Sequence, residues 1–439
     1  MKQLEKGSSK LLNAWVSYDW ANSVYSLVIA SAIFPIYYGQ LFKNKGVQEI
    51  EVFGIVLKNT ALISFVTAFA FLVVAFFSPL LSGIADYVGN KKNFMRFFCY
   101  LGAFSCIGLY WFDLDNIYFS IACYFFGLIG FWGSLVFYNS YLPDIAFPEQ
   151  QDRVSARGYS MGYIGSVVLL LLNLVLVMKP EWFPTWFGLE GPDAKMKAMR
   201  YSFISVGVWW ILFSQYAFYY LPTGNENTNK VHSGILFNGF KELKKVWHQL
   251  EDNIRLKRYL VSFFVYSIAV QTVMLVATYF GEQEISWADD DQKTQGLIVS
   301  ILLIQFVAVL GAVITSRASE KFGNIKVLIV INFIWIIICI TAFFVTLPIH
   351  FYITAGFVGL VMGGIQALSR STYSKFLPET QDTASYFSFY DVAEKIGIVI
   401  GMVLYGVIDQ ITGSMRNSIV FLALFFISGV ILLLRVPKK

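Results

Sequence analysis

Long runs of apolar residues recur along the whole 439-residue chain, and short polar segments separate them. Each run is long enough to cross about 30 Å of hydrocarbon as a helix, whereas outer-membrane barrel strands are about ten residues long and alternate in polarity. We therefore predict an all-α polytopic membrane protein. The twelve predicted transmembrane helices cover residues 14–41, 60–85, 94–112, 117–142, 157–178, 200–221, 259–281, 295–317, 326–347, 351–376, 386–409 and 416–435. Pro348 favours a break between the ninth and tenth helices over one long helix.

Composition excludes several classes of protein. The chain is 57% hydrophobic and 14% charged, while soluble proteins carry about 25% charged residues. The net charge of +5 is spread among loops and forms no nucleic-acid groove. The four cysteines lie in apolar runs without a CxxC pair, and the three histidines are scattered, so we predict no metal and no cofactor. Neither a Walker A motif nor a Ser-His-Asp set is present, so we predict neither direct use of ATP nor an enzyme.

Positive charge sets the predicted orientation. With both termini inside, the inner segments hold 21 Lys and Arg residues and the outer segments hold nine. The positive-inside rule then places both termini in the cytoplasm. The first apolar run is too long for a signal peptide and contains Asp19 and Pro35, so we expect it to be retained as a span.

An internal repeat predicts two related halves. The sequence Leu-Pro-acid at Leu142–Asp144 recurs at Leu377–Glu379, and Gly89-Asn90 matches Gly323-Asn324 at nearly the same offset. We therefore expect two pseudo-symmetric six-helix bundles, residues 1–221 and 259–439, joined by a cytoplasmic linker over 222–258. Such repeats with a substrate site at their interface are a secondary-transporter architecture.

The linker contains an amphipathic pattern. Its apolar residues recur at helical spacing, and lysines flank them. One interpretation is a helix that lies on the inner leaflet and tethers the halves, and the other is a link packed against the bundle. The residues are Leu236, Phe240, Leu243, Trp247 and Leu250, with Lys241, Lys244 and Lys245.

The sequence of the loop after the second predicted helix, residues 83–92, indicates its physical role. Asp86 lies where it can cap or salt-bridge a neighbouring helix end, and Gly89 permits a left-handed turn. We expect the lysines to stay on the cytoplasmic side. The loop is therefore predicted to latch a cytoplasmic gate rather than to bind substrate, through Gly83, Asp86, Gly89, Lys91 and Lys92.

This loop resembles the signature between the second and third helices of the major facilitator superfamily, although Tyr87 stands where an Arg is usual. Three other stretches are similar to a narrower branch, the vacuole-effluxer-like family, which includes fungal vacuolar amino-acid exporters. The stretches are Tyr18–Ser23, Tyr138–Asp144 and Gly364–Ser371. The resemblance covers nearly the whole chain and implies twelve helices in two bundles that work by alternating access. Bacterial members need not share the fungal substrate.

Ionisable groups inside the spans are the main functional candidates, because they are expensive in a bilayer. Asp19 shares a helix face with Asn22, and Tyr25 lies on an adjoining stripe. Asp19 is either a substrate or proton site, or it caps a helix end or pairs with a loop lysine.

Arg370 lies near the inner end of the tenth predicted helix, one turn after Gln366. Its fork can bind an anionic part of the substrate, or it can form a structural ion pair. If the bundle resembles its superfamily, Asp19 and Arg370 lie at similar depth. Tyr138, Asn139, Gln271 and Gln305 are further cavity candidates or form interhelical hydrogen bonds.

The eleventh predicted helix carries Asp391, Glu394 and Lys395. Asp391 and Lys395 can pair at i, i+4, which leaves Glu394 without an obvious local partner. Two interpretations stay open: either Glu394 or Asp19 carries a coupling proton, or the three residues form a salt-bridge gate between the halves.

The leading interpretation is a secondary active transporter of a small polar solute, with an amino acid as one candidate. We expect the lipid bilayer and a coupling proton as partners, a monomer, and a location in a bacterial inner membrane. The alternative is a polytopic receptor or lipid-handling protein without solute transport.

Overall fold

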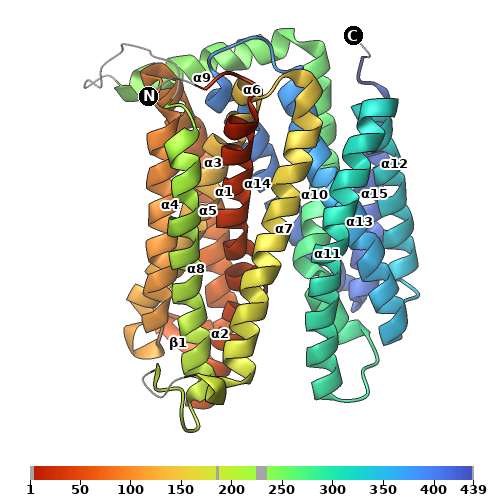
Figure 1. Cartoon of the computed structure of the whole chain (residues 1–439). Helices are drawn as coiled ribbons and strands as arrows, with labels where there is room; N and C mark the ends of the chain where they lie inside the picture. Colours follow the sequence, from red (N-terminus) through yellow and green to blue (C-terminus); the bar gives the residue numbers. More distant parts are fainter. Residues whose placement is uncertain (1–3, 184–186, 224–234, 438–439) are drawn as a thin grey trace.

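The computed structural model describes residues 4–183, 187–223 and 235–437, and every structural statement below refers to these residues. The chain forms long helices that run side by side, with one helix lying across their ends (Figure 1). The α-helices are α1 (Ser9–Val24), α2 (Ile33–Lys45), α3 (Asn59–Val88), α4 (Lys91–Gly108), α5 (Ile117–Ser140), α6 (Leu142–Ile145), α7 (Pro148–Met178), α8 (Ala194–Tyr220), α9 (Ile235–Asp252), α10 (Ile254–Glu284), α11 (Asp290–Phe322), α12 (Asn324–Ala342), α13 (Pro348–Phe376), α14 (Thr383–Thr412) and α15 (Met415–Leu434). The remaining elements are the π-helix η1 (Tyr25–Ala32), the 3-10 turns η2 (Leu109–Trp111), η3 (Leu114–Asn116) and η4 (Pro180–Trp182), and the strands β1 (Glu49–Val52) and β2 (Ile55–Lys58).

Each predicted span coincides with a helix, and the first one combines α1, η1 and α2. Ten of these segments are long and apolar enough to cross a membrane by themselves. The other two are α8, which is rich in Trp, Tyr and Ser, and α14, which carries the charged residues Asp391, Glu394 and Lys395 within about one helical turn. As predicted, a break separates α12 from α13.

Several predicted boundaries were wrong by more than one turn. Helix α7 begins at Pro148 rather than at residue 157, and α10 begins at Ile254 rather than at 259. The physical reason is that hydropathy marks only the apolar part of a helix. Each of these helices begins with a polar turn, after a proline in α7 and after an Asn cap in α10, and this turn precedes the apolar part.

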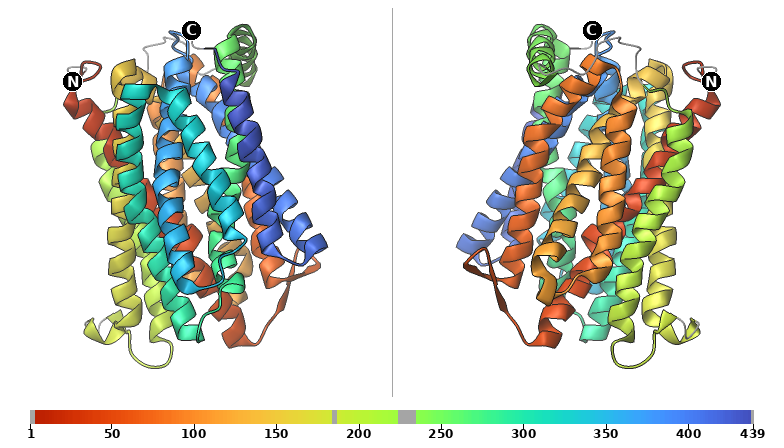
Figure 2. Two further views of the ribbon diagram at one scale, coloured as in Figure 1. Left: turned by 90° about the vertical axis from the view of Figure 1, so that its right-hand side faces the viewer. Right: turned by 90° about the vertical axis from the view of Figure 1, so that its left-hand side faces the viewer.

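The helices form two groups, each with its own apolar core. Helices α1–α8, the first half, surround one core, and α10–α15, the second half, surround another. The described chain begins and ends at the same end of the molecule, which we call the terminal end (Figure 1). Helix α9 lies at this end, crosswise to the spanning helices (Figure 2).

A short antiparallel hairpin interrupts the otherwise helical chain between α2 and α3. The sequence analysis did not predict it, because residues 42–59 were assigned only as a connection between two spans. The hairpin turns at Phe53 and Gly54, whose φ angles are 52° and 77°. Positive φ at both central residues is the geometry of a two-residue type I′ turn.

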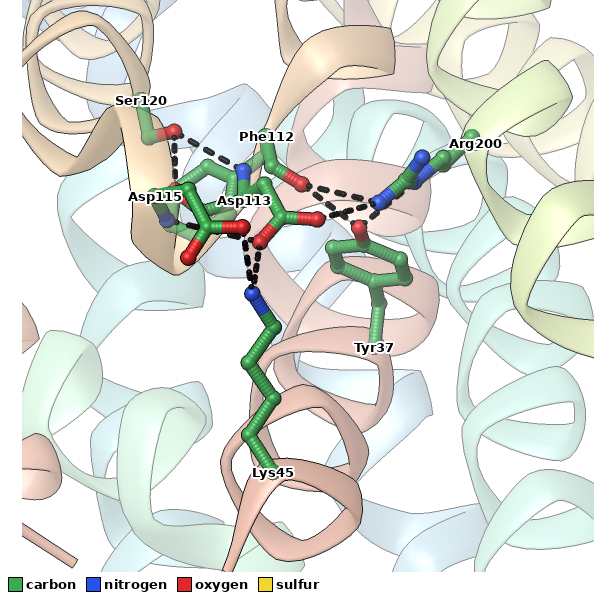
Figure 3. Close-up of polar contacts among 7 residues, drawn as sticks. All are labelled: Tyr37, Lys45, Phe112, Asp113, Asp115, Ser120 and Arg200. Atoms are coloured by element: carbon green, nitrogen blue, oxygen red, sulfur yellow. Dashed lines mark hydrogen bonds and ion pairs between the residues drawn. The ribbon is translucent and has the colours of Figure 1, made fainter. Parts of the chain in front are cut away.

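A polar cluster ties the first half together at the end opposite the terminal end (Figure 3). Asp113 receives hydrogen bonds from Lys45 at 2.6 Å and from Arg200 at 3.1 Å. Arg200 also donates to the Tyr37 hydroxyl at 2.7 Å. Partial burial acts to raise the pKa of Asp113, but the hydrogen bonds from Lys45 and from the Asp115 backbone lower it below its ordinary value. The stabilisation from Asp113 is therefore lost as the pH falls through this lowered pKa.

The second half has its closest helix crossing between α11 and α13. A Cβ atom built at Gly363 overlaps the backbone carbonyl of Ala308, and one built at Gly311 overlaps that of Leu360. Small residues of this kind let two membrane helices approach at backbone distance. This crossing fixes the position of α13, the helix that carries Arg370.

We therefore expect Gly363→Val to lower the melting temperature of the purified protein in detergent. Overpacking of this kind destabilises by about 1–3 kcal/mol. Gly356→Val is the matched control, because Gly356 lies on the same helix and an added Cβ there meets nothing within 4 Å. Equal melting temperatures of the two variants would contradict the close packing.

Candidate functional site

Arg370 connects the two halves near the terminal end of α13. It extends from α13 into the first half and is only 1% exposed. Its Nε donates to the Ser155 hydroxyl at 3.0 Å, and its Nη2 donates to the Ser155 carbonyl at 3.0 Å. Its Nη1 donates to Asn139 Oδ1 at 3.1 Å, and Nη2 lies 3.4 Å from Asp19 Oδ2. One guanidinium thus binds residues of α7, α5 and α1.

Aromatic rings enclose this guanidinium. Its Cζ lies 4.1 Å from the centre of the Tyr159 ring and 4.7 Å from that of Trp15. Trp15 stacks on Tyr138 with 4.5 Å between ring centres, and the Tyr138 hydroxyl donates to Asp19 at 2.6 Å. Cation–π contacts stabilise a buried guanidinium in addition to its ion pair.

The close approach of α1 and α7 depends on Gly158. A Cβ there would lie 2.5 Å from Asp19 Oδ2 and 3.1 Å from Arg370 Nη2. Gly158 therefore packs directly against the ion pair.

Four of the residues predicted for the substrate site meet here: Asp19, Tyr138, Asn139 and Arg370. The other three, Asn22, Tyr25 and Gln366, lie apart from this ion pair.

Gln366 lies one turn before Arg370 on α13 and accepts a hydrogen bond from the Tyr163 hydroxyl of α7. Asn22 is buried, and its Oδ1 accepts a hydrogen bond from Ser23 at 3.3 Å. Tyr25 packs inside the first half, where its ring stacks on Phe131. Of these three residues, therefore, only Gln366 contacts the other half in the described structure.

A π-helix, η1, begins at Tyr25 on the first span. In η1, the Ser31 hydroxyl donates to the carbonyl of Ser26, five residues earlier, at 3.0 Å. Segments of π-helix are rare and occur often at functional sites. The apolar pattern of the sequence did not predict this π-helix, because it looks the same for an α-helix.

A second charged cluster lies on α14. Lys395 Nζ donates to Asp391 at 2.7 Å, which confirms the predicted i, i+4 pair, and to Glu394 at 3.0 Å. The side chain of Gln271 on α10 donates to Glu394 at 2.6 Å, so Glu394 does have partners. Lys395 Nζ also lies 3.7 Å from the centre of the Trp132 ring on α5.

Tyr159 of α7 belongs to the first of these two clusters, because its ring covers the guanidinium of Arg370. Glu394 keeps 18% of its side chain exposed, whereas Arg370 keeps 2%. Of these two charged groups, Glu394 is therefore the more exposed.

Nearer the terminal end, the predicted gate loop contacts the second half. Asp86 accepts hydrogen bonds from the backbone N–H groups of Ala384 and Ser385 at 3.3 and 2.7 Å, and so caps the start of α14. Lys91 pairs with Asp144 and donates to Thr383 Oγ1 at 2.9 Å.

Other residues of the loop act within the first half. Lys92 donates to the carbonyl of Leu221 at 2.7 Å. Gly89 ends α3 with a φ of 72°, the left-handed turn that was predicted, and Gly83 lies within the last turns of α3. Both lysines of the loop are buried.

The sequence analysis missed a second contact between the halves at this end. Asp152 of α7 receives hydrogen bonds from Ser319 at 2.7 Å, Asn324 at 2.9 Å and Lys375 at 2.6 Å. Two signals could have identified it, because Asp152 recurs in the repeat as Asp382 and Lys375 lies near the end of an apolar run. Ser155, Tyr159, Trp15 and Trp132 gave no such signal.

In the part of the chain that the structure describes, no group of three or more His, Cys, Asp or Glu side chains could hold a metal ion. The four cysteines are buried and unpaired.

Comparisons with known proteins agree with this architecture. The family model described as "Vacuole effluxer Atg22 like" matches residues 7–439. The "Uncharacterized MFS-type transporter YxiO" of Bacillus subtilis (strain 168) is 30% identical, over 99% of this chain and 96% of that protein. "Autophagy-related protein 22" of Eremothecium gossypii is 23% identical, over 95% of this chain and 88% of that protein.

Solved transporter structures share the fold. The transporter FucP in the outward conformation superimposes with a TM-score of 0.70 at 14% identity, over 98% of each chain. The proton:xylose symporter XylE superimposes with a TM-score of 0.68 at 12% identity, over 98% of this chain and 95% of that one.

The ion pair makes a testable contribution to stability. We expect Arg370→Gln to destabilise the protein by about 3–5 kcal/mol, because it leaves the Asp19 carboxylate buried without a cation. Adding Asp19→Asn should recover part of this loss, because both groups are then neutral. The measurement is a double-mutant cycle on unfolding in detergent. A coupling free energy of zero between the two positions would exclude the pair.

Proposed function

The chain belongs to the Atg22-like vacuole effluxer family of the major facilitator superfamily, and from this premise we propose that it moves a small polar solute across the membrane by alternating access. The protein is an integral, multi-pass membrane protein of a transporter family. We propose further that it acts as a monomer in the cell membrane of a bacterium, with the terminal end in the cytoplasm. The excess of Lys and Arg at that end and the bacterial relative support this placement.

The ion pair between Arg370 and Asp19 carries the proposal. Each half supplies one member, so moving the halves apart separates the two charges. Separated and still shielded from water, each charge would need a new partner. A zwitterionic solute such as an amino acid supplies both, with its carboxylate for the guanidinium and its ammonium for Asp19. This role combines the two sequence interpretations of Arg370.

The conformation supports the same mechanism. The contacts of Asp86, Lys91 and Asp152 hold the two halves together at the terminal end. With that end in the cytoplasm, the structure represents a state that is closed to the cytoplasm. The similarity to a transporter solved in its outward conformation supports this assignment. The family description supports export as the direction.

We propose that Glu394 carries the coupling proton. Asp391, Glu394 and Lys395 together carry a net negative charge when all are ionised, and a proton on Glu394 neutralises the group. Glu394 is the most exposed of the three, with 18% of its side chain accessible against 6% for Asp391 and 1% for Lys395. It can therefore exchange a proton while the Asp391–Lys395 pair stays intact.

The first test measures solute exchange in sealed proteoliposomes, with a panel of radiolabelled amino acids. We expect Arg370→Lys to reduce exchange by about ten- to a hundredfold, because Lys keeps the charge and loses the planar fork. Arg435→Gln removes an exposed cation at the terminal end and serves as the control. Exchange that is unchanged in Arg370→Lys would remove Arg370 from the substrate site, and no flux of any solute would contradict the transport function.

The second test separates proton coupling from solute binding. We expect Glu394→Gln to retain solute exchange at equilibrium, because the amide still fits between Gln271 and Lys395. The variant should lose accumulation driven by an imposed pH gradient. Concentrative transport by Glu394→Gln with an unchanged pH dependence would refute the proton role.

A further inference from the structure

The linker helix α9 packs on the bundle through one of its faces. Val246 is fully buried and Leu250 is 5% exposed, and both belong to the apolar core of the second half. The side chain of Leu236, part of the predicted apolar face, lies outside the described residues. Helix α9 lies at the level of the ends of the spanning helices, to one side of them (Figure 2).

One flank of α9 is held by the start of α14. Lys245 donates to Asp382 at 2.8 Å, and Gln249 accepts a hydrogen bond from the Tyr386 hydroxyl at 3.1 Å. These contacts, together with the buried face, fix the rotation of α9 about its own axis. The direction in which the other flank points is therefore determined.

That other flank exposes two large aromatic side chains. Phe240 is 62% exposed and Trp247, seven residues later on the same stripe of the helix, is 49% exposed. Exposed aromatic pairs at this spacing are unusual on a surface that faces only water.

The aromatic flank continues into a lipid-facing surface. The Trp247 ring packs on Phe389 of α14, with 5.7 Å between ring centres. At seven-residue steps along the same helix follow Ile396, 44% exposed, and Val403, 58% exposed. An exposed apolar stripe on a spanning helix faces acyl chains. Trp247 therefore lies where this stripe meets the headgroup region, which is the level that Trp prefers in membrane proteins.

Two cationic side chains lie close to Phe240 on α9: Lys241 follows it in the sequence, and Lys244 lies one turn later. Lys241 and Lys244 are both exposed. Long lysine side chains extend from apolar surfaces towards the headgroups, and a lysine near an anionic leaflet is attracted to it.

We propose that α9 binds anionic phospholipid headgroups at the terminal-end leaflet, with Phe240 and Trp247 inserted at the acyl boundary and Lys241 and Lys244 on the lipid phosphates. The continuity with the acyl-facing stripe of α14 favours a lipid surface over a protein partner. The proposal does not depend on the transported solute.

The test uses quenching of Trp247 fluorescence by brominated lipids, with the full-length protein in vesicles. Its signal is the difference between the wild-type protein and Trp247→Phe. One set of vesicles contains phosphatidylcholine alone, and the other adds an equal part of phosphatidylglycerol, with the bromine on one lipid at a time. We expect both brominated lipids to quench Trp247, with a preference for phosphatidylglycerol of about five- to thirtyfold.

The lysines are tested with a matched pair of double variants. Lys241→Gln/Lys244→Gln should reduce the preference for phosphatidylglycerol to about one. Lys43→Gln/Lys195→Gln removes two exposed lysines near the opposite end and should leave the preference unchanged. Melting temperatures of all variants show whether each is folded.

Three results would overturn the proposal. Neither brominated lipid could quench the Trp247 fluorescence, which would place α9 in water or under a protein partner. The preference could survive in Lys241→Gln/Lys244→Gln, or it could fall equally in both double variants, which would reflect only the overall charge. None of these results bears on solute transport, which is measured separately.

Discussion

The rest of the structure depends on burying one guanidinium at the boundary between two helix bundles. A buried, unpaired cation is too expensive to tolerate, so Arg370 needs partners from the half to which it does not belong. Asp19, Asn139 and Ser155 supply them. Because these partners come from three different helices, the first half must be assembled before Arg370 can be satisfied. The ion pair therefore links the folding of each half to the association of the two.

The contacts between the halves form layers along the helices. Lys91 and Asp86 make their contacts at the terminal end. Asp152 makes its contacts near the start of α7, and Arg370 of α13 binds Ser155, three residues later on α7. All are polar, and polar contacts can be exchanged for water or solute at little net free energy. An apolar interface would have to expose its area to separate. Beside these polar layers the halves also meet through apolar side chains, since Ala156 of α7 packs with Ala312 and Ala367 of the second half. The interface is therefore mixed, with its charged groups gathered in layers.

The sequence predicted those features that depend on local pattern. Apolar runs identified the spans, and Gly89 identified a left-handed helix end, which its φ of 72° confirms. Charges inside the spans identified Asp19 and Arg370, because a lipid environment makes them conspicuous. The partners of these charges were harder to predict. Ser155, Tyr159 and Trp132 are ordinary residues for a membrane helix, and only the packing of helices distant in sequence brings them to a cation. The hairpin at Phe53 was missed because its strands are only four residues long and lie in a connection between two spans.

The repeat shows why related halves need not behave alike. Asp86 caps α14, whereas its counterpart Glu320 is exposed. Asn90 caps its own helix by accepting from Asn93, whereas the matching Asn324 donates to Asp152 across the interface. The difference follows from the backbone, since Gly89 adopts the left-handed conformation and Gly323 has a ψ of 148°. Equivalent loops therefore make different contacts with the opposite half. The two sets of contacts at the terminal end are therefore not related by the repeat, and a substitution in one loop need not have the effect of the matching substitution in the other.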